Sequence, residues 1–267
     1  MASVDPHTSV VIDVPPGADP RRFVHWPVSG RLSDVPQYVC HSASTLRALV
    51  AAGVPPQRCA MLPPARLPAP AEFSSSDAVR AALRLCAGDR VAVVLPPVTR
   101  ATGGYFAAWA GLLVEKVHGC LRIVAPGGSR EAERIGRLAR AVRHDHMVRL
   151  APAAISIHDL LAAADVSVYL EQGDGSLSTS LTALGTGVPL IAVDTPTLRA
   201  VLPSEDAAWL VADRQPKTVA AALLRVLDHP EEATRRAVAA RDALAGRFEP
   251  AARLAAYRTL YDAESDA

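Results

Sequence analysis

The sequence predicts an α/β protein whose larger part is a doubly wound parallel sheet. Three observations support this: strand-like runs are apolar throughout, helix-like stretches separate them, and glycine-rich turns follow several of them. Strands that are apolar on both faces are typical of a parallel sheet covered by helices on both sides. With 267 residues, half of them apolar, the chain is long enough to bury one large core or two smaller ones.

A short strand–helix–strand unit follows 36 proline-rich residues without a clear pattern. Residues 37–40, QYVC, have the composition of a strand, 44–53 predict a helix ended by a glycine, and 58–62 predict a second strand. Several prolines between 63 and 76 remove backbone donors and predict a linker. The expected organisation is residues 1–62, a linker at 63–76 and a larger domain at 77–267.

Strand-like and helix-like stretches alternate beyond the linker. The expected strands are VAVVL (91–95), LRIVA (121–125), MVRL (147–150), VSVYL (166–170), VPLIAV (188–193) and AWLVA (208–212). The expected helices are 103–117, 129–145, 156–164, 176–185 and 197–202, with two or three more over 217–261. Ser156 with Asp159 fits a capping box, and Pro230 with Glu231 and Glu232 suits a first helical turn.

Four loops are expected at one rim of this sheet, because ligands of doubly wound sheets bind beyond the carboxyl ends of the strands. The loops are PPVTRATGG, PGGSR, APAAIS and EQGDGSLSTS. A glycine-rich loop between a strand and a helix brings backbone N–H groups close to an anion, which predicts a phosphate site. A tight connection in a packed domain is the alternative interpretation.

Charge, cysteine and histidine patterns exclude several classes of function. The net charge is +1 and the arginines are scattered among acidic residues, so no nucleic-acid role is expected. The four cysteines are isolated, and His144 and His146, two apart, would not share a helix face, so no metal site is predicted. Neither a signal peptide nor an apolar run of roughly 20 residues is present, so we expect a cytoplasmic protein without a transmembrane segment.

Four segments carry a resemblance to a known family: HSASTLRALVAAGVPPQRCAMLPP, LRIVAPGGS, HDLLAAADVSVYL and LTALGTGVPLIAVD. Their order resembles the nucleotide-sugar-dependent glycosyltransferases of the GT-B fold, particularly the retaining group 1, or family 4, type. The resemblance covers most of 37–245. It implies a Rossmann-like C-terminal donor domain, a short N-terminal βαβ remnant of an acceptor-type domain, and a nucleoside diphosphate sugar as donor substrate. It implies neither a metal nor any other cofactor.

In that family, an arginine and a lysine after the first strand of the donor domain clamp the diphosphate. With Gly103 at the position of the family glycine, Thr102 stands at the lysine and Pro97 near the arginine. Arg100 lies within a few residues and could substitute, since a guanidinium contacts phosphate bidentately. An exposed loop arginine is the alternative.

The family also carries two glutamates, the second of which holds the ribose. Their positions correspond to Asp174 and Thr182, and Glu171 could replace Asp174 only through a shift in the loop. Losing a carboxylate at Thr182 would weaken ribose binding by about 1–3 kcal/mol. Hydroxyl groups at the start of the following helix could contact diphosphate, or could simply cap the helix.

The resemblance thus implies two groups of site residues. Asp174 and Arg100 are the candidate catalytic residues. The candidate donor-binding residues are Gly127, Gly128, Gly173, Gly175, Ser176, Ser178, Thr179 and Thr182.

Two main hypotheses about function follow. The first is a glycosyltransferase-like enzyme that transfers a sugar from a nucleoside diphosphate sugar to an unknown acceptor, with a second chain as a possible source of the acceptor domain. The second is a catalytically inactive glycosyltransferase-fold module that binds a sugar nucleotide or a partner chain. A sugar-nucleotide epimerase is a weaker third possibility, since it would normally need two full domains.

Overall fold

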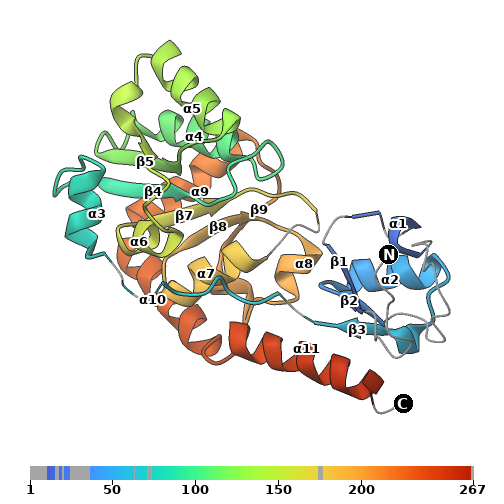
Figure 1. Cartoon of the computed structure of the whole chain (residues 1–267). Helices are drawn as coiled ribbons and strands as arrows, with labels where there is room; N and C mark the ends of the chain where they lie inside the picture. The colour runs from blue at the N-terminus through green and yellow to red at the C-terminus, as the bar shows by residue number, and fades with distance from the viewer. Residues whose placement is uncertain are drawn as a thin grey trace. The chain divides into compact units, whose positions relative to one another are not determined.

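The computed structural model describes residues 11–15, 18–19, 21–24, 37–62, 64–70, 72, 74–173 and 177–265 (Figure 1). The chain divides into two compact units. The smaller unit consists of Met1–Ala65, Gly173–Leu177 and Phe248–Ala267, and the larger unit consists of Arg66–Gln172 and Ser178–Arg247.

The smaller unit is built on a three-stranded parallel sheet in the order β1-β2-β3. Its strands are β1 (Val11–Val14), β2 (Gln37–Cys40) and β3 (Cys59–Met61), and its helices are α1 (Arg21–Val24), α2 (Ala43–Ala51), the 3₁₀ helix η1 (Pro56–Arg58) and α11 (Pro250–Ser265). Its core contains Val14, Tyr38, Cys40, Leu49 and Val54. The strand–helix–strand unit expected at 37–62 is present, with β1 added at its edge.

The last helix differs from the sequence-based expectation. Residues over 217–261 were expected to close the larger domain, yet α11 groups with the smaller unit. Its side chains explain this: Tyr257 donates a 2.6 Å hydrogen bond to Asp13 in β1, and Arg253 donates to the carbonyl of Leu62. The same guanidinium lies 3.0 Å from Nδ1 of His41.

The larger unit is a six-stranded, all-parallel sheet in the order β6-β5-β4-β7-β8-β9. The strands are β4 (Arg90–Val94), β5 (Leu121–Pro126), β6 (Val148–Ala151), β7 (Val166–Tyr169), β8 (Leu190–Val193) and β9 (Trp209–Val211). Each coincides with one of the apolar runs in the sequence. The α/β class with a doubly wound parallel sheet is therefore confirmed.

Eight helices of the described part of the chain surround this sheet. They are α3 (Ser76–Ala82), α4 (Gly104–Val114), α5 (Arg130–Ala141), α6 (Ile157–Ala162), α7 (Ser178–Thr186), α8 (Pro196–Arg199), α9 (Pro216–Asp228) and α10 (Pro230–Ala243), with the 3₁₀ helices η2 (Asp145–Met147) and η3 (Glu205–Ala207) between them. Helix α3 was not expected from the sequence, although Ser75 caps it by accepting a hydrogen bond from the Ala78 amide.

Helices cover both faces of the larger sheet (Figure 1). Helices α4, α5 and α9 lie over one face and share a core with the strands, whereas α6, α7 and α10 lie over the other. Central strand residues such as Val93 and Ile191 are fully buried, as a sheet covered on both sides requires. At Gly111 of α4, an added Cβ would lie 2.6 Å from two side-chain atoms of Ile123, so glycine permits the close approach of helix and sheet.

Two local sequence patterns are confirmed. Ser156 and Asp159 form a complete capping box at the start of α6, with the Asp159 amide donating to the Ser156 hydroxyl and the Ser156 amide donating to the Asp159 carboxylate. Pro230, Glu231 and Glu232 occupy the first turn of α10. These caps depend on neighbours in sequence, which is why the pattern alone predicted them.

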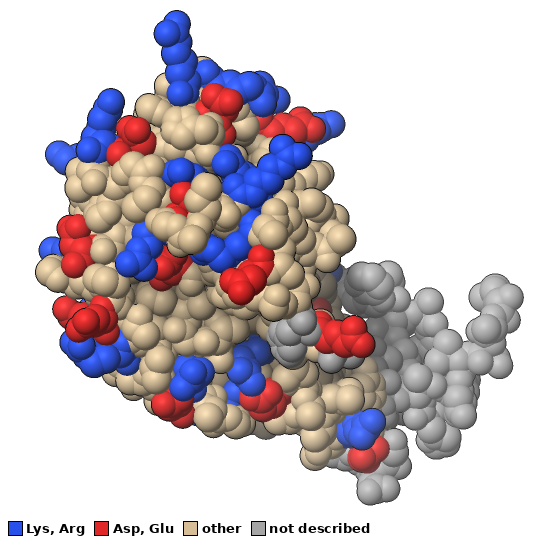
Figure 2. Space-filling model, turned by 90° about the vertical axis from the view of Figure 1, so that its left-hand side faces the viewer, with Lys and Arg blue, Asp and Glu red and all other residues tan. Residues whose placement is uncertain are grey.

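The described helices include none with both the length and the apolarity needed to cross a membrane. On the face drawn in Figure 2, lysine and arginine side chains alternate with aspartate and glutamate side chains. Ion pairs such as Arg199–Asp194 and Arg236–Asp206 illustrate this mixing on the larger unit.

Candidate functional site

The strand order places a topological switch point at β4. Strand β5 pairs with one edge of β4 and β7 pairs with the other, so the chain leaves β4 and β7 into loops that diverge to opposite faces. A crevice at such a point is where doubly wound sheets bind ligands. The loops are joined here: the Leu170 amide donates to the Thr102 carbonyl at 3.2 Å, and the Ser129 hydroxyl donates to the Val98 carbonyl at 3.0 Å.

The loop after β4, residues 95–103, is held by its own hydroxyl groups. The Thr102 hydroxyl donates to the Pro97 carbonyl and accepts from the Thr99 amide, and Thr102 is only 5% exposed. Thr102 therefore shapes the loop, and its hydroxyl is engaged inside it. The loop ends at Gly103, whose φ of +68° lies in the left-handed region.

The start of α4 has the features of an anion site. Its N-cap is Gly103, without a side-chain cap, and its first turn contains no acidic residue. The free N–H groups of a helix N-terminus and its dipole both favour an anion. Arg100 is exposed in the preceding loop. Arg214, after β9, donates to the carbonyls of Arg100 and Ala101 and stacks over Phe106 of α4.

The start of α5 is different, because the protein already supplies acceptors there. Ser129 caps the helix by accepting from the Ala132 amide. Glu131 and Glu133 lie in the first turn, and Glu131 is buried and paired with Arg134 at 2.7 Å. These carboxylates offset the positive end of the helix. Any bound anion near this loop must therefore rely on the glycine backbone.

The two predicted glycines of that loop have different structural roles. Gly128 has φ +82°, and a Cβ added there would meet nothing within 4 Å, so the space next to its Cα is open. At Gly127, an added Cβ would lie 3.0 Å from the Ala151 carbonyl oxygen, and its amide donates to that same oxygen. Gly127 thus joins the loops after β5 and β6, and its contact with a donor sugar stays a prediction.

The hydroxyl groups of α7 are mostly turned inward. Thr179 is 6% exposed, and Thr182, only 2% exposed, donates to the Ser178 carbonyl and accepts from the Leu67 amide at 2.8 Å. A ribose contact at Thr182 stays a prediction, and it would have to compete with these two bonds. Ser178 is half-buried, and the hydroxyl of Ser180 is buried without a hydrogen-bond partner among the described residues.

Three of the predicted site residues, Asp174, Gly175 and Ser176, lie outside the described residues. Gly173 is described, with φ +116°, and groups with the smaller unit. The predicted site residues that lie in the described part of the larger unit are therefore Arg100, Gly127, Gly128, Ser178, Thr179 and Thr182.

Two carboxylates at the carboxyl ends of β7 and β8 already have partners. Glu171 accepts a 2.6 Å hydrogen bond from the hydroxyl of Tyr169. Burial and this bond raise the pKa of Tyr169 well above its ordinary value. Asp194 forms a bidentate pair with Arg199, whose hydrogen bonds hold the pKa of the carboxyl below its usual range. Glu171 is thus the described carboxylate nearest in sequence to Asp174.

Two cavities of the larger unit lie away from this rim. One of about 230 Å³ lies at the amino ends of the strands, beside the Arg90–Asp165 ion pair. Another, of about 540 Å³, lies beside β9 and is lined by Trp209, Arg225 and Arg236. We assign the candidate site to the carboxyl rim despite these hollows, because the switch point and the free helix start occur there.

The six-stranded parallel sheet, with helices on both faces, defines a Rossmann-like doubly wound domain of the kind that GT-B glycosyltransferases contain. Comparison with protein families gives the more specific assignment. Residues 101–229 match the family described as "Glycosyl transferases group 1". The predicted resemblance to group 1 glycosyltransferases is thus confirmed for this stretch. None of the curated proteins matches the sequence.

Solved structures of glycosyltransferases share the fold. HepE of Anabaena, in complex with UDP and glucose, is 12% identical with a TM-score of 0.68, over 84% of this chain and 62% of that one. A glycosyltransferase of Rickettsia africae is 10% identical with a TM-score of 0.76, over 95% and 70% of the two chains. Sucrose-phosphate synthase of Thermosynechococcus elongatus is 20% identical with a TM-score of 0.66, over 86% and 59%. The chain thus spans about three fifths to seven tenths of these proteins.

Sequence reasoning missed Arg214 as a candidate site residue. It lies 114 residues from Arg100, after the short strand β9, and no motif marks it. Only the parallel sheet brings the two loops together. The four loops that the sequence placed at the rim did not include the loop after β9.

Proposed function

We propose that the chain is a glycosyltransferase-like protein that binds a nucleoside diphosphate sugar at the carboxyl rim of the larger sheet and transfers the sugar to an acceptor. The observation that carries this proposal is the start of α4, which has no side-chain cap and no acidic residue in its first turn, and lies next to the loop in which Arg214 donates to the Arg100 carbonyl. The group 1 family match over 101–229 supports the same reaction class.

The charges at the start of α4 support a diphosphate as the ligand. Arg100 and Arg214 bring positive charge to a helix end that is itself positive, which is unfavourable until an anion binds. In sugar transfer the diphosphate is the leaving group, and donors fixed around it stabilise the charge that develops as the glycosidic bond breaks. We assign Arg100 and Arg214 to this role.

The sugar and ribose would be bound by the loops next to β4 on either side. The open side of Gly128 and the half-buried Ser178 at the start of α7 are the available polar surfaces of the larger unit. Asp174, the candidate catalytic residue, lies outside the described residues. Glu171 is the described carboxylate that could take its role. We propose no metal in this reaction, because the arginines and helix ends supply the positive charge that the leaving group needs.

The acceptor is a separate matter, because the chain aligns with about 70% of the Rickettsia glycosyltransferase. We propose that a second chain, or a further part of the same protein, completes the acceptor side. Co-purification followed by mass measurement tests this: a stable heteromer supports a second chain, whereas sugar transfer by a monomer of residues 1–267 alone contradicts the proposal.

A second candidate function is binding without turnover. Thr102 and Thr182 stand where the resemblance expects a lysine and a glutamate, and this favours the second function. Their hydroxyl groups already donate to the carbonyls of Pro97 and Ser178. Such a protein would bind a sugar nucleotide or a partner chain and catalyse nothing.

Titration with uridine, guanosine and adenosine diphosphates and their sugars distinguishes these functions. Binding with slow hydrolysis of a sugar nucleotide supports the enzyme, whereas binding without turnover supports the inactive module. Absence of binding to any of them contradicts the enzyme and the sugar-nucleotide form of the inactive module, and leaves only a module that binds a partner chain. Arg100→Ala and Arg214→Ala should each weaken binding, with Arg130→Ala as the matched control, because Arg130 lies at the start of α5, where two glutamates are already present.

A further inference from the structure

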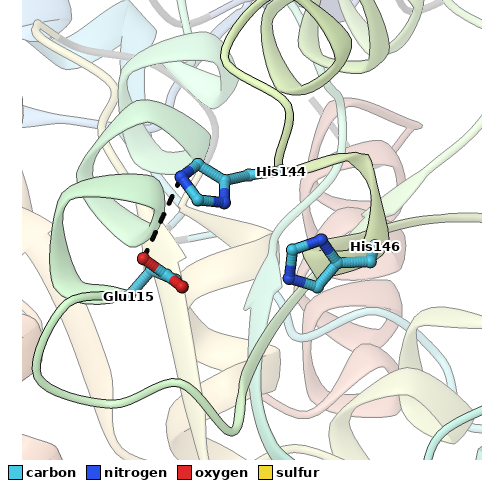
Figure 3. Close-up of side chains that lie close together, drawn as sticks. All are labelled: Glu115, His144 and His146. Atoms are coloured by element: carbon cyan, nitrogen blue, oxygen red, sulfur yellow. Dashed lines mark ion pairs between the residues drawn. The ribbon is translucent and has the colours of Figure 1, made fainter.

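Glu115, His144 and His146 come together at the end of the larger sheet opposite the candidate site (Figure 3). Helix α4 begins at the carboxyl rim and ends next to Glu115, its C-cap residue. His144 is the N-cap of η2 and His146 lies within it, and η2 leads directly into β6. The cluster therefore lies near the amino ends of the strands, away from the rim.

The donor atoms of these side chains are close enough to share one cation. One donor atom from each residue lies within 4.8 Å of the others, and His144 Nε2 is 3.9 Å from Glu115 Oε2. Figure 3 shows the imidazole of His144 facing the carboxylate, with the ring of His146 beside them. Bonds of 2.0–2.1 Å to a tetrahedral zinc ion separate donors by about 3.3 Å. Small side-chain rotations would thus close the site.

Two atoms of the cluster are buried without a hydrogen bond. Glu115 Oε2 and His144 Nδ1 have no hydrogen-bond partner within the part of the chain that the structure describes. Buried polar atoms of folded proteins are nearly always satisfied, and an unpaired carboxylate oxygen is especially costly. A cation among the three residues would give Glu115 Oε2 a direct positive ligand in place of the long 3.9 Å contact with His144.

The end of α4 adds to the need for positive charge. The last carbonyls of a helix and its dipole favour a cation, and a carboxylate there is unfavourable. The last turn of α4 contains no basic residue. Among the described residues, the only ion pair of Glu115 is the one with His144, at 3.9 Å, which requires the imidazole to be protonated.

We propose that Glu115, His144 and His146 bind a divalent transition-metal ion of the zinc class. Two imidazole nitrogens and one carboxylate oxygen are a common ligand set for zinc, and the exposed position of His146 leaves room for water as a fourth ligand. The ion ties the end of α4 to the turn before β6. It acts on the stability of the larger unit and does not take part in sugar transfer.

Metal titration of the full chain tests this proposal. The protein is stripped with a chelator and titrated with Zn²⁺ by calorimetry, and then with Co²⁺, whose visible absorption reports the ligand geometry. We expect one tight site per chain. A ligand that binds only the folded state at about 100 times its Kd should raise the Tm by roughly 5–10 °C for a unit of this size.

Matched variants distinguish the cluster from adventitious binding. His146→Ala removes an exposed ligand with little risk to folding, and it should weaken Zn²⁺ binding by about 100-fold or more. The double variant His144→Asn, His146→Asn should weaken it by at least as much. Glu115→Gln removes the charged ligand, so it should weaken Zn²⁺ binding by at least the roughly 10- to 100-fold that is typical of groups supporting a ligand. His118→Ala is the control, because His118 forms a two-residue pair with Asp228 at 2.9 Å and should have no effect.

The same data can overturn the proposal. Unchanged Zn²⁺ affinity in the His146→Ala protein would refute the site, whether or not the other variants fold. An equal loss of affinity in His118→Ala, or a Co²⁺ spectrum identical to that of the aqueous ion, would show that surface histidines bind the metal non-specifically.

Discussion

A methyl group added at Gly103 would meet the chain at two points. An added Cβ lies 2.7 Å from Leu170 Cβ and 3.1 Å from the Leu170 carbonyl oxygen, and the residue has φ +68°. The left-handed backbone costs about 1–2 kcal/mol for a residue with a side chain. Overpacking against a fixed strand end adds about 1–3 kcal/mol. Gly103→Ala should therefore destabilise the larger unit by about 2–5 kcal/mol.

Gly128→Ala is the matched control for this prediction. Gly128 also has a left-handed φ, +82°, but an added Cβ there meets nothing within 4 Å. Its substitution should cost only the backbone contribution of about 1–2 kcal/mol. Urea unfolding followed by circular dichroism measures both free energies, and the difference reports the contact between the loops after β4 and β7.

The result that would refute this reasoning is an equal loss of stability in the two variants. It would mean that the loop after β4 moves away from Leu170 at no cost, so that the rim is not a preformed site. The thermal unfolding of Gly103→Ala should also shift by roughly 5–15 °C, given a unit of this size.

Three further predictions concern single side chains. Arg100→Ala should weaken diphosphate binding, measured by calorimetry, by about 10- to 100-fold. Arg199→Ala should have a smaller effect, since Arg199 is already paired with a carboxylate. Equal effects of the two substitutions would contradict the role of Arg100. Thr182→Val should destabilise the larger unit by about 1–3 kcal/mol, because it leaves the Leu67 amide of the linker unpaired. Thr182→Ser should retain stability. If the Thr182→Val protein alone lost nucleotide affinity while its stability stayed unchanged, the hydroxyl would face a ribose instead. Burial and the hydrogen bond to Asp13 raise the pKa of Tyr257 to about 12, so its stabilising contribution should be complete below pH 10, the ordinary pKa of tyrosine, and be lost as the pH rises from about 10 to 12. Tyr257→Phe should lack this alkaline loss in pH-dependent unfolding, and an identical profile would show that Tyr257 does not titrate in this way.

Local sequence patterns were sufficient for much of the fold. Each of the six strands of the larger sheet coincides with an apolar run, and the central strands β7 and β8 are buried at every position, as a sheet covered on both faces requires. Capping of α6 by Ser156 and Asp159 was readable because its partners are three residues apart. The strand β1 and helix α3 were missed, since both are short and lie in proline-rich surroundings.

The candidate sites show where sequence reasoning ended. Spacing argued against a metal at His144 and His146, because residues two apart do not share an α-helical face. The structure places them on a turn and a 3₁₀ helix and brings Glu115 from 29 residues away in sequence. In the same way, Arg214 joins Arg100 only through the packing of β9 and α4.

The sequence by itself determined the alternation of strands and helices, the parallel sheet, the glycine-bearing rim and the resemblance to group 1 glycosyltransferases. Each of these depends on residue type and short spacing, which the chain carries locally. Tertiary structure alone decided that α11 belongs with the smaller unit, that Thr182 holds the linker, and which charges meet at the two ends of α4. Such contacts join residues far apart in the chain, and their formation depends on how whole elements pack.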